Sequence, residues 1–271
     1  MYDPLNNIFM SDRITTLDYA DRWLRDGLHE CGRAGTLEAI EVDVTLAAAI
    51  LLNLKSEGTP ITWTHVFVRA TAIVLDRHPE LHQLVGGNSC LHPSRVDICL
   101  SLAGNSRITP VLIIEDAARK DLRTIATEIR CRTQEATDES GKMLVVLRRL
   151  GWLVPFSALR RVLIGFALRQ LWYRRKVSGT FQVTCLPQVD LFAPFLFNTA
   201  AALGVGGVRD RVVAVDGRPV VRPMVTLSCC LDHAQWNGMS AALFLTKLRD
   251  LLESGVFADN LEPTGPPTAR P

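Results

Sequence analysis

The chain has 271 residues, 48% of them hydrophobic and 21% charged, and a formal net charge of +2. This length and apolar content allow a substantial core, arranged as one large domain or as two small ones. The small net charge argues against a nucleic-acid partner, as does the lack of zinc-finger spacing, an RNP-like aromatic motif or a basic terminal arm.

The cysteines and the first residues indicate a cellular compartment. The 7 cysteines form no CxxC pair, and their number is odd, so the pattern predicts neither a metal site nor a disulfide framework. The opening MYDPLNNIFMSDR lacks the basic region and apolar core of a secretory signal. We therefore expect a cytoplasmic protein.

Apolar periodicity and turn residues predict alternating helices and strands in the first half of the chain. Ser11 is a plausible cap for the first helix, and His78-Pro79 ends the third because proline disfavours a helical residue before it. The predicted order is helix 12–29, strand 38–45, helix 46–56, helix 62–77, strands 95–103 and 107–115 around a turn at Gly104-Asn105, and helix 121–137.

Four histidines of this half carry no pattern that indicates catalysis. His65 falls inside a predicted core helix, and His78 falls at its end. His82 and His92 have no carboxylate or cysteine at metal-ligand spacing, which favours surface or turn roles for both.

The segment Gly141–Lys176 differs from the rest in its charge. It contains nine lysines and arginines and no acidic residue, interleaved with large apolar residues. Arginines interrupt the apolar runs too often for a membrane-spanning helix, which needs about 20 apolar residues. Two amphipathic helices broken near Pro155 fit the pattern better.

Three interpretations of this segment stay open. It can be a helical hairpin that covers the domain or joins subunits, with its arginines solvated or paired. It can be a basic lid that receives a phosphate-bearing acyl donor, with Arg148, Arg149, Arg160 and Arg161 as the candidate ligands. It can also make peripheral contact with an anionic membrane or a lipid-like acyl chain.

The second half reads mainly as strands. Asp216-Gly217 between valine-rich flanks is the strongest hairpin signal of the chain. The composition after Val256 is typical of a frayed end. The predicted order is strand 180–186, an irregular stretch 190–198, strand 200–208, the hairpin, strand 224–231 and a helix with Ala242, Leu245, Leu248 and Leu252 facing the core.

The strand at 224–231 leads directly to His233, and Asn237-Gly238 follow before the last helix. A histidine at such a junction can be held rigidly, and its titration near neutrality suits it to take a proton from a thiol or hydroxyl. A lone histidine at a strand end is more often only a satisfied polar residue, so its neighbours decide the interpretation.

These neighbours resemble the Hxxx(D/N)G signature of the chloramphenicol acetyltransferase and dihydrolipoyl acyltransferase superfamily. Motifs similar to that family's precede it in the same order: Ile108–Asp116, Gly179–Thr184, Ala202–Gly206, Val215–Gly217 and Val221–Pro223. The resemblance implies an α/β (α+β) two-layer sandwich, chloramphenicol acetyltransferase-like, with a large mixed sheet flanked by helices. It implies one catalytic domain over 1–257, with a basic helical insertion at about 141–176 and a flexible tail at 258–271.

The resemblance also implies roles for individual residues. His233 corresponds to the general base, and Thr184 to the hydroxyl that donates a hydrogen bond to the oxyanion. Asn237 stands where most members have aspartate, so it can hydrogen-bond the backbone but cannot form an ion pair. Gly238 permits a tight turn or close packing at the helix start.

An acyltransferase of this kind would move an acyl group from coenzyme A, or from the phosphopantetheine thioester of an acyl carrier protein, to a small-molecule acceptor. Family members are homotrimers whose active site takes the histidine from one subunit and the serine or threonine from the next. Ala234 and Leu186-Pro187 differ from the dihydrolipoyl enzymes, and no lipoyl domain precedes the core. We therefore expect a stand-alone enzyme with no tightly bound cofactor.

Two alternatives remain at this point. The first is a cyclase or other biosynthetic enzyme that uses the same scaffold without acyl transfer, which the unusual insertion and the altered surroundings of Thr184 motivate. The second is a non-catalytic trimeric binding protein, for which Asn237 is the only argument.

Overall fold

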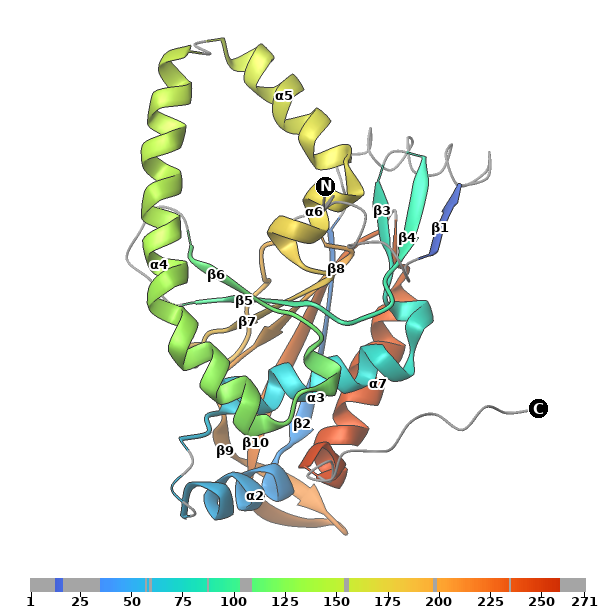
Figure 1. The fold of residues 1–271 in the computed structure, drawn as a ribbon. Helices are drawn as coiled ribbons and strands as arrows, with labels where there is room; N and C mark the ends of the chain where they lie inside the picture. The colour runs from blue at the N-terminus through green and yellow to red at the C-terminus, as the bar shows by residue number, and fades with distance from the viewer. Residues whose placement is uncertain are drawn as a thin grey trace, which may run out of the picture.

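The computed structural model describes residues 13–16, 35–56, 58, 60–86, 88–102, 109–153, 156–196, 199–233 and 235–258, with the backbone alone at 35, 143, 144, 147–153, 157, 158, 160, 161 and 168. Figure 1 shows a large twisted sheet with helices packed against it and a pair of helices that rises above it. The predicted class, a mixed sheet flanked by helices, is confirmed.

The strands are β1 (Arg13–Thr16), β2 (Gly35–Asp43), β3 (Leu84–Gly86), β4 (Ser89–His92), β5 (Ile98–Ser101), β6 (Val111–Ile114), β7 (Phe181–Cys185), β8 (Ala201–Val205), β9 (Arg209–Val215) and β10 (Arg218–Asp232). The helices are α2 (Thr45–Ser56), α3 (Trp63–Arg77), α4 (Leu122–Leu153), α5 (Ser157–Arg169), α6 (Leu171–Ser178) and α7 (Gly238–Ser254), with short 3-10 turns η1 (Pro79–Leu81), η2 (Ala117–Arg119) and η3 (Val256–Ala258).

Strand β10 is the centre of the large sheet. It pairs antiparallel with β2, β8 and β9, and the sheet continues from β8 through β7 and β5 to β6. The β7 strand runs parallel to both β5 and β8, so the sheet is mixed. The β9–β10 turn has positive φ at both Asp216 (50°) and Gly217 (75°), as the predicted two-residue hairpin requires.

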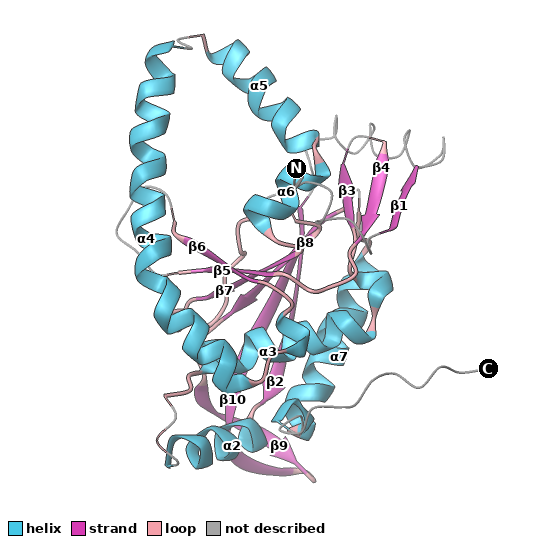
Figure 2. Cartoon of the chain, viewed as in Figure 1, coloured by secondary structure: helices cyan, strands magenta, loops and turns pink. Residues whose placement is uncertain are grey.

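One face of the large sheet is covered by helices (Figure 2). Phe244 of α7 is fully buried and packs against Phe181 of β7 and Trp236, with ring centroids 5.1 and 5.7 Å away. The inner side of α7 is formed by Ala241, Phe244, Leu245, Leu248, Leu251 and Leu252. Ala242 was expected in this set and is exposed, because the buried stripe passes one residue before it.

A second, three-stranded sheet has the order β1-β4-β3. The helix expected over 12–29 is wrong at 13–16, where β1 pairs antiparallel with β4. Two adjacent β-branched threonines, Thr15 and Thr16, fit the pleated strand, and pairing with β4 outweighs the helical spacing of the apolar residues. The remainder of that predicted helix lies outside the described residues, as do the turn at Gly104-Asn105 and the tail after Ala258.

The basic segment forms three helices where two were expected. The first is a continuation of α4, which runs unbroken for 32 residues from the predicted helix 121–137 into the segment. The chain then enters α5 and α6, on either side of Gln170. We call residues 141–169 the arm; in Figure 1 it rises away from the large sheet. None of the described helices is both long and apolar enough to cross a membrane.

The base of the arm is fixed by two buried arginines of α6. Arg175 Nε lies 3.1 Å from Asp97 Oδ2, and both side chains are at least 95% buried. Arg174 Nη1 donates to the carbonyl oxygen of Val85 in β3. Because an unpaired buried charge is costly, these contacts hold the start of β5 and the end of the insertion together.

Two of the histidines away from the motif, His65 and His82, are buried. His65 Nδ1 accepts from Thr62 N at 3.0 Å, which caps α3, and burial lowers its pKa to about 4. His82 does lie in a turn, but it is 4% exposed and therefore not at the surface. The chain reverses between η1 and β3 there, and burial lowers the pKa of His82 to about 3.

Candidate active site

The turn that carries His233 is built at the end of β10. Asp232 still pairs with the sheet, because its N–H donates to Ala200 O at 2.9 Å. The Asp232 carbonyl then accepts from Gln235 N at 2.8 Å and Trp236 N at 3.0 Å, which closes a tight turn. His233 is exposed in that turn, and no other described residue hydrogen-bonds its ring. The imidazole is therefore open to a substrate from outside the chain.

Gln235 clamps this turn to the small sheet, and sequence reasoning missed it. Its Nε2 donates to Asp232 Oδ2, and its Oε1 accepts from Val85 N, both at 2.7 Å. One side chain therefore joins the residue before His233 to β3. Gln235 occupies one of the x positions of the Hxxx(D/N)G pattern, so only its contact with β3 in the folded structure reveals that it holds the turn.

The end of the motif starts α7. Asn237 is the N-cap, and its Oδ1 accepts from Ser240 N at 2.8 Å and from Ser240 Oγ at 3.0 Å. This satisfies a backbone donor that the first helical turn would otherwise leave unpaired. A Cβ on Gly238 would lie 2.8 Å from Glu38 Oε1, so β2 approaches closely here. Asn237 and Gly238 thus fix the exit of the His233 turn.

Thr184 lies on the sheet face opposite the helices. It is level with Ser101 of β5 and Gly204 of β8, and Gly204 is level with Ser228 of β10. Residues level across neighbouring strands share a face. Thr184 Oγ1 donates to Ser101 Oγ at 3.1 Å, and the Gln182 amide nitrogen lies 3.5 Å from Thr184 Oγ1. This half-buried hydroxyl is therefore positioned by two polar neighbours.

A loop borders this face beside Thr184. Ser228 Oγ donates to Phe192 O at 2.7 Å, and Gln182 Nε2 donates to Phe195 O at 2.9 Å. The loop nevertheless presents large apolar side chains to solvent: Leu186, Val189, Leu191 and Phe195 are 40%, 41%, 51% and 78% exposed. An exposed apolar loop therefore lies beside Thr184.

The structure does not bring His233 and Thr184 together in one chain. Ser228 is the β10 residue level with Gly204 and Thr184, and His233 follows it by five positions. At about 3.3 Å per residue along the strand and about 4.8 Å between strands, the two sites are roughly 16 Å apart along the sheet and roughly 10 Å across it. A single reacting carbonyl cannot contact both side chains of the same chain.

Cysteines close to this region are unsuited to act as nucleophiles. Burial raises the pKa of Cys185, the neighbour of Thr184, to about 12. Burial also raises the pKa of Cys99 to about 12 and raises that of Cys229 in β10. A thiol with such a pKa stays protonated near pH 7, which disfavours an acyl-cysteine intermediate on these three residues.

The candidate phosphate ligands lie in the arm. Arg148 and Arg149 belong to α4, and Arg160 and Arg161 belong to α5. Their side chains lie outside what the structure describes, so their role as ligands stays a prediction.

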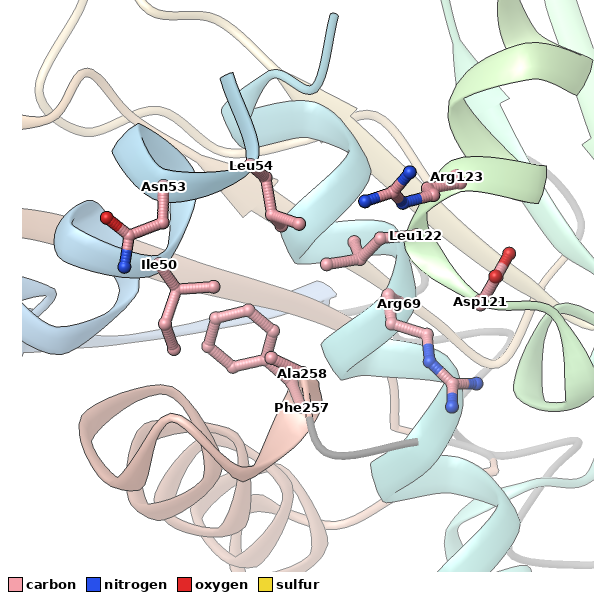
Figure 3. Close-up of a pocket in the computed structure, with 9 residues that line it drawn as sticks. All are labelled: Ile50, Asn53, Leu54, Arg69, Asp121, Leu122, Arg123, Phe257 and Ala258. Carbon is pink, nitrogen blue, oxygen red and sulfur yellow. The ribbon is translucent and has the colours of Figure 1, made fainter. Parts of the chain in front are cut away.

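A pocket lies at the other end of α7. Its cavity of about 140 Å³ is lined by Ile50, Phe257, Arg69, Asp121 and others (Figure 3). The Arg69 guanidinium is already engaged, because Nη1 donates to Ala117 O at 3.4 Å. Helix α7 starts just after the His233 turn and ends just before Phe257, so its 17 residues separate the two sites by about 25 Å. The pocket is not part of the His233 site.

A family model, the 2-oxoacid dehydrogenases acyltransferase (catalytic domain), matches residues 34–143 and 178–257. The match includes the His233 turn, Thr184 and both halves of the large sheet. The chain belongs to this family. The match leaves out 144–177, which is most of the basic segment.

Two curated relatives are lipoamide acyltransferase components of branched-chain alpha-keto acid dehydrogenase complexes. The Bacillus subtilis protein is 25% identical over 224 residues, 79% of this chain and 46% of its own length. The Pseudomonas putida protein is 47% identical over 145 residues, 51% of this chain and 34% of its own length. The chain thus spans less than half the length of these two acyltransferases.

Solved structures share the fold. Azotobacter vinelandii dihydrolipoamide acetyltransferase superposes with a TM-score of 0.64 at 19% identity, covering 87% of this chain and 88% of that one. A serine, a histidine and an asparagine four residues after it were investigated there for a role in the catalytic mechanism. A chloramphenicol acetyltransferase gives a TM-score of 0.51 at 12% identity and covers 89% of this chain and 100% of that one.

Proposed function

We propose that this protein is an acyltransferase that moves an acyl group from a thioester of coenzyme A, or of a carrier-protein phosphopantetheine, to a small-molecule thiol, alcohol or amine. The observation that carries the proposal is the exposed His233, held in a clamped turn at the end of β10 in a chain of this family. The relatives' own activity is acyl transfer, which favours this function over a cyclase or a non-catalytic binding protein.

In the proposed reaction the His233 imidazole removes the proton of the acceptor S–H, O–H or N–H group. The acceptor atom attacks the thioester carbonyl, and the resulting oxyanion receives a hydrogen bond from Thr184 Oγ1. The C–S bond then breaks, and the leaving thiolate takes the proton back from the imidazolium. The thioester enters as a co-substrate, and no electron donor or acceptor is needed.

We infer that each active site combines two subunits, with His233 from one and Thr184 from its neighbour. The separation of the two side chains within one chain supports this arrangement. The exposed apolar loop beside Thr184, with Leu191 at 51% and Phe195 at 78%, supplies a surface that a neighbouring subunit would bury. A homotrimer is the assembly that we propose.

Asn237 is proposed to act through the turn and not on the substrate. As N-cap it holds the start of α7 with an acceptor oxygen alone, which an aspartate would also supply. Asn237→Asp should therefore retain activity within about threefold, since both residues are strong N-caps. Asn237→Ala should lower kcat.

A thiol-release assay over a panel of acyl-CoAs tests the reaction. Acceptor-dependent release by the wild type should fall by about 100-fold to 10,000-fold in His233→Ala, because a positioned general base contributes about that much. His233 is exposed, so the variant should keep the wild-type unfolding midpoint. Equal release by a correctly folded His233→Ala would exclude the proposed base.

Mixing two inactive variants tests the shared site. His233→Ala and Thr184→Ala subunits are unfolded together, refolded together and compared with each variant refolded alone. A trimer with active sites between subunits should recover activity in about one quarter of its sites, because each site needs one intact residue from each neighbour. Mixed assemblies, verified by an affinity tag on one variant, that stay inactive would contradict the two-subunit site.

A further inference from the structure

The α5 helix turns an apolar stripe to solvent. Phe156 at the N-cap and four large apolar residues within α5 fall at helical spacing on one side, in the i, i+3, i+4, i+7 pattern. In a globular domain such a stripe is normally buried against the core. Here the exposed fractions are 72% for Phe156, 47% for Leu159, 67% for Val162, 51% for Leu163 and 67% for Phe166.

The charge around this stripe has one sign. The segment Gly141–Lys176 has nine basic and no acidic residues, and Arg174 and Arg175 are used at its base. Seven basic residues therefore remain on or beside the arm. The whole chain has 30 basic and 28 acidic residues. Outside Gly141–Lys176 there are 21 basic and 28 acidic residues, a net charge of −7. One negatively charged surface would attract the arm and repel the rest of the chain.

We propose that the arm binds the surface of an anionic lipid bilayer. An interfacial helix combines a polar face rich in arginine with an apolar face of leucine and phenylalanine, and it lies in the plane of the headgroups. Helical spacing places Arg160 and Arg161 outside the apolar stripe of α5. The arm rises above the sheet in Figure 1, so a flat surface can reach it.

A second copy of the arm fits this stripe less well. Two arms packed together would bring together two segments that each carry six basic residues and no acidic residue, so neither would offer the other a partner of opposite charge. An anionic bilayer supplies both missing components, because its headgroups neutralise the arginines and its acyl chains receive Val162 and Phe166. The acidic remainder of another copy is the competing occupant, and the test separates it from lipid.

The arm is connected to the candidate active site through one residue. Val85 accepts a hydrogen bond from Arg174 at the base of the arm and donates one to Gln235 in the His233 turn. A docked arm would therefore hold that turn beside the lipid surface. Lipid binding itself requires no catalytic residue, so it can be tested whether or not His233 is a base.

The test is co-sedimentation of the full chain with lipid vesicles. Vesicles of phosphatidylcholine with about 30% phosphatidylserine should carry the protein down at low salt. Pure phosphatidylcholine vesicles should bind at least about tenfold more weakly, and about 0.5 M salt should weaken binding to the anionic vesicles, because screening reduces the attraction of each arginine. Equal binding to both vesicle types, or no binding to either, would overturn the proposal.

Matched variants locate the contact. Val162 in α5 and Leu52 in α2 are both 67% exposed, so an aspartate at either is tolerated by the fold. Val162→Asp should weaken binding by about tenfold or more, since it removes an apolar side chain that the bilayer would bury, whereas Leu52→Asp should leave it unchanged. Arg160→Gln with Arg161→Gln should cost about 30-fold, at about fivefold per arginine.

The oligomeric state of the same variants identifies the competing occupant. If lipid is the partner, Val162→Asp and Leu52→Asp should have the wild-type mass by light scattering in the absence of vesicles. If Val162→Asp instead dissociates the assembly and vesicle binding is unaffected, the stripe is an interface between copies and the lipid proposal is wrong.

Discussion

Helix α7, which packs on the large sheet, and helix α5, which lies in the arm, have the same apolar spacing and opposite environments. In α7, Phe244 and Leu248 are fully buried against the sheet, whereas in α5 Val162 and Phe166 are 67% exposed. Apolar periodicity therefore shows that a helix has a face in need of a partner, but not which partner it has. In α7 that partner is the chain's own core, whereas the described residues leave the α5 stripe uncovered, and we propose a partner for it outside the chain.

The difference is sharpest for two phenylalanines. Phe244→Ala should lower the free energy of unfolding by about 3 to 5 kcal/mol, since it leaves a cavity between Phe181 and Trp236. Phe166→Ala should change it by no more than about 0.5 kcal/mol, because the side chain is exposed. Urea unfolding at pH 7.5 measures both. Similar losses in the two variants would mean that α5 packs against the domain.

The junction between the two regions can be broken at α6. Arg175→Ala should cost about 3 kcal/mol, because it removes the buried partner of Asp97 and leaves it the half-exposed Arg95. Burial raises the pKa of Asp97 and lowers that of Arg175, so both charges are already held at a cost in desolvation. Lys176→Ala is the control, since Lys176 is the next residue of α6 and its side chain is exposed. An equal effect of both changes in urea unfolding would show that the ion pair contributes nothing specific.

Removing the Gln235 side chain, which clamps the His233 turn, should have a smaller effect on stability than the Arg175 change and a separate effect on activity. Gln235→Leu should cost about 2 kcal/mol, since two hydrogen bonds of about 1 kcal/mol each are lost. If Gln235 positions His233, kcat should fall while the KM of the thioester stays nearly constant. A loss of stability with unchanged kcat would limit Gln235 to a structural role.

The smallest effect is a dependence on pH from the buried histidines. His82 has a folded pKa of about 3 and an ordinary value near 6.5, so only the unfolded chain takes up a proton between these values. Its contribution to stability is full above pH 6.5 and is lost as the pH falls. At pH 5.5 the loss should be about 1 kcal/mol. His82→Phe should remove that part of the difference between the free energies of unfolding at pH 7.5 and at pH 5.5. An unchanged difference would mean that His82 is solvated in the folded protein.

The His233 turn could be predicted because its residues follow one another in the sequence and match a known family signature. A strand, a histidine and an Asn-Gly pair before a helix are consecutive, and each backbone preference acts within a few residues. The role of Gln235 could not be predicted, because its partner Val85 is 150 residues away in sequence. The helix expected at 12–29 was wrong at 13–16 for a similar reason: the pairing of β1 with β4 joins residues far apart in the chain.

The sequence by itself determined the Asp216-Gly217 hairpin, because short motifs specify local backbone geometry. Its resemblance to a known family indicated the mixed sheet and the candidates His233, Thr184 and Asn237. Only the tertiary structure decided that His233 and Thr184 of one chain lie at separate places on the sheet, and that the α5 stripe is exposed. Register and burial depend on which strands and helices meet, and long-range packing energies set those choices.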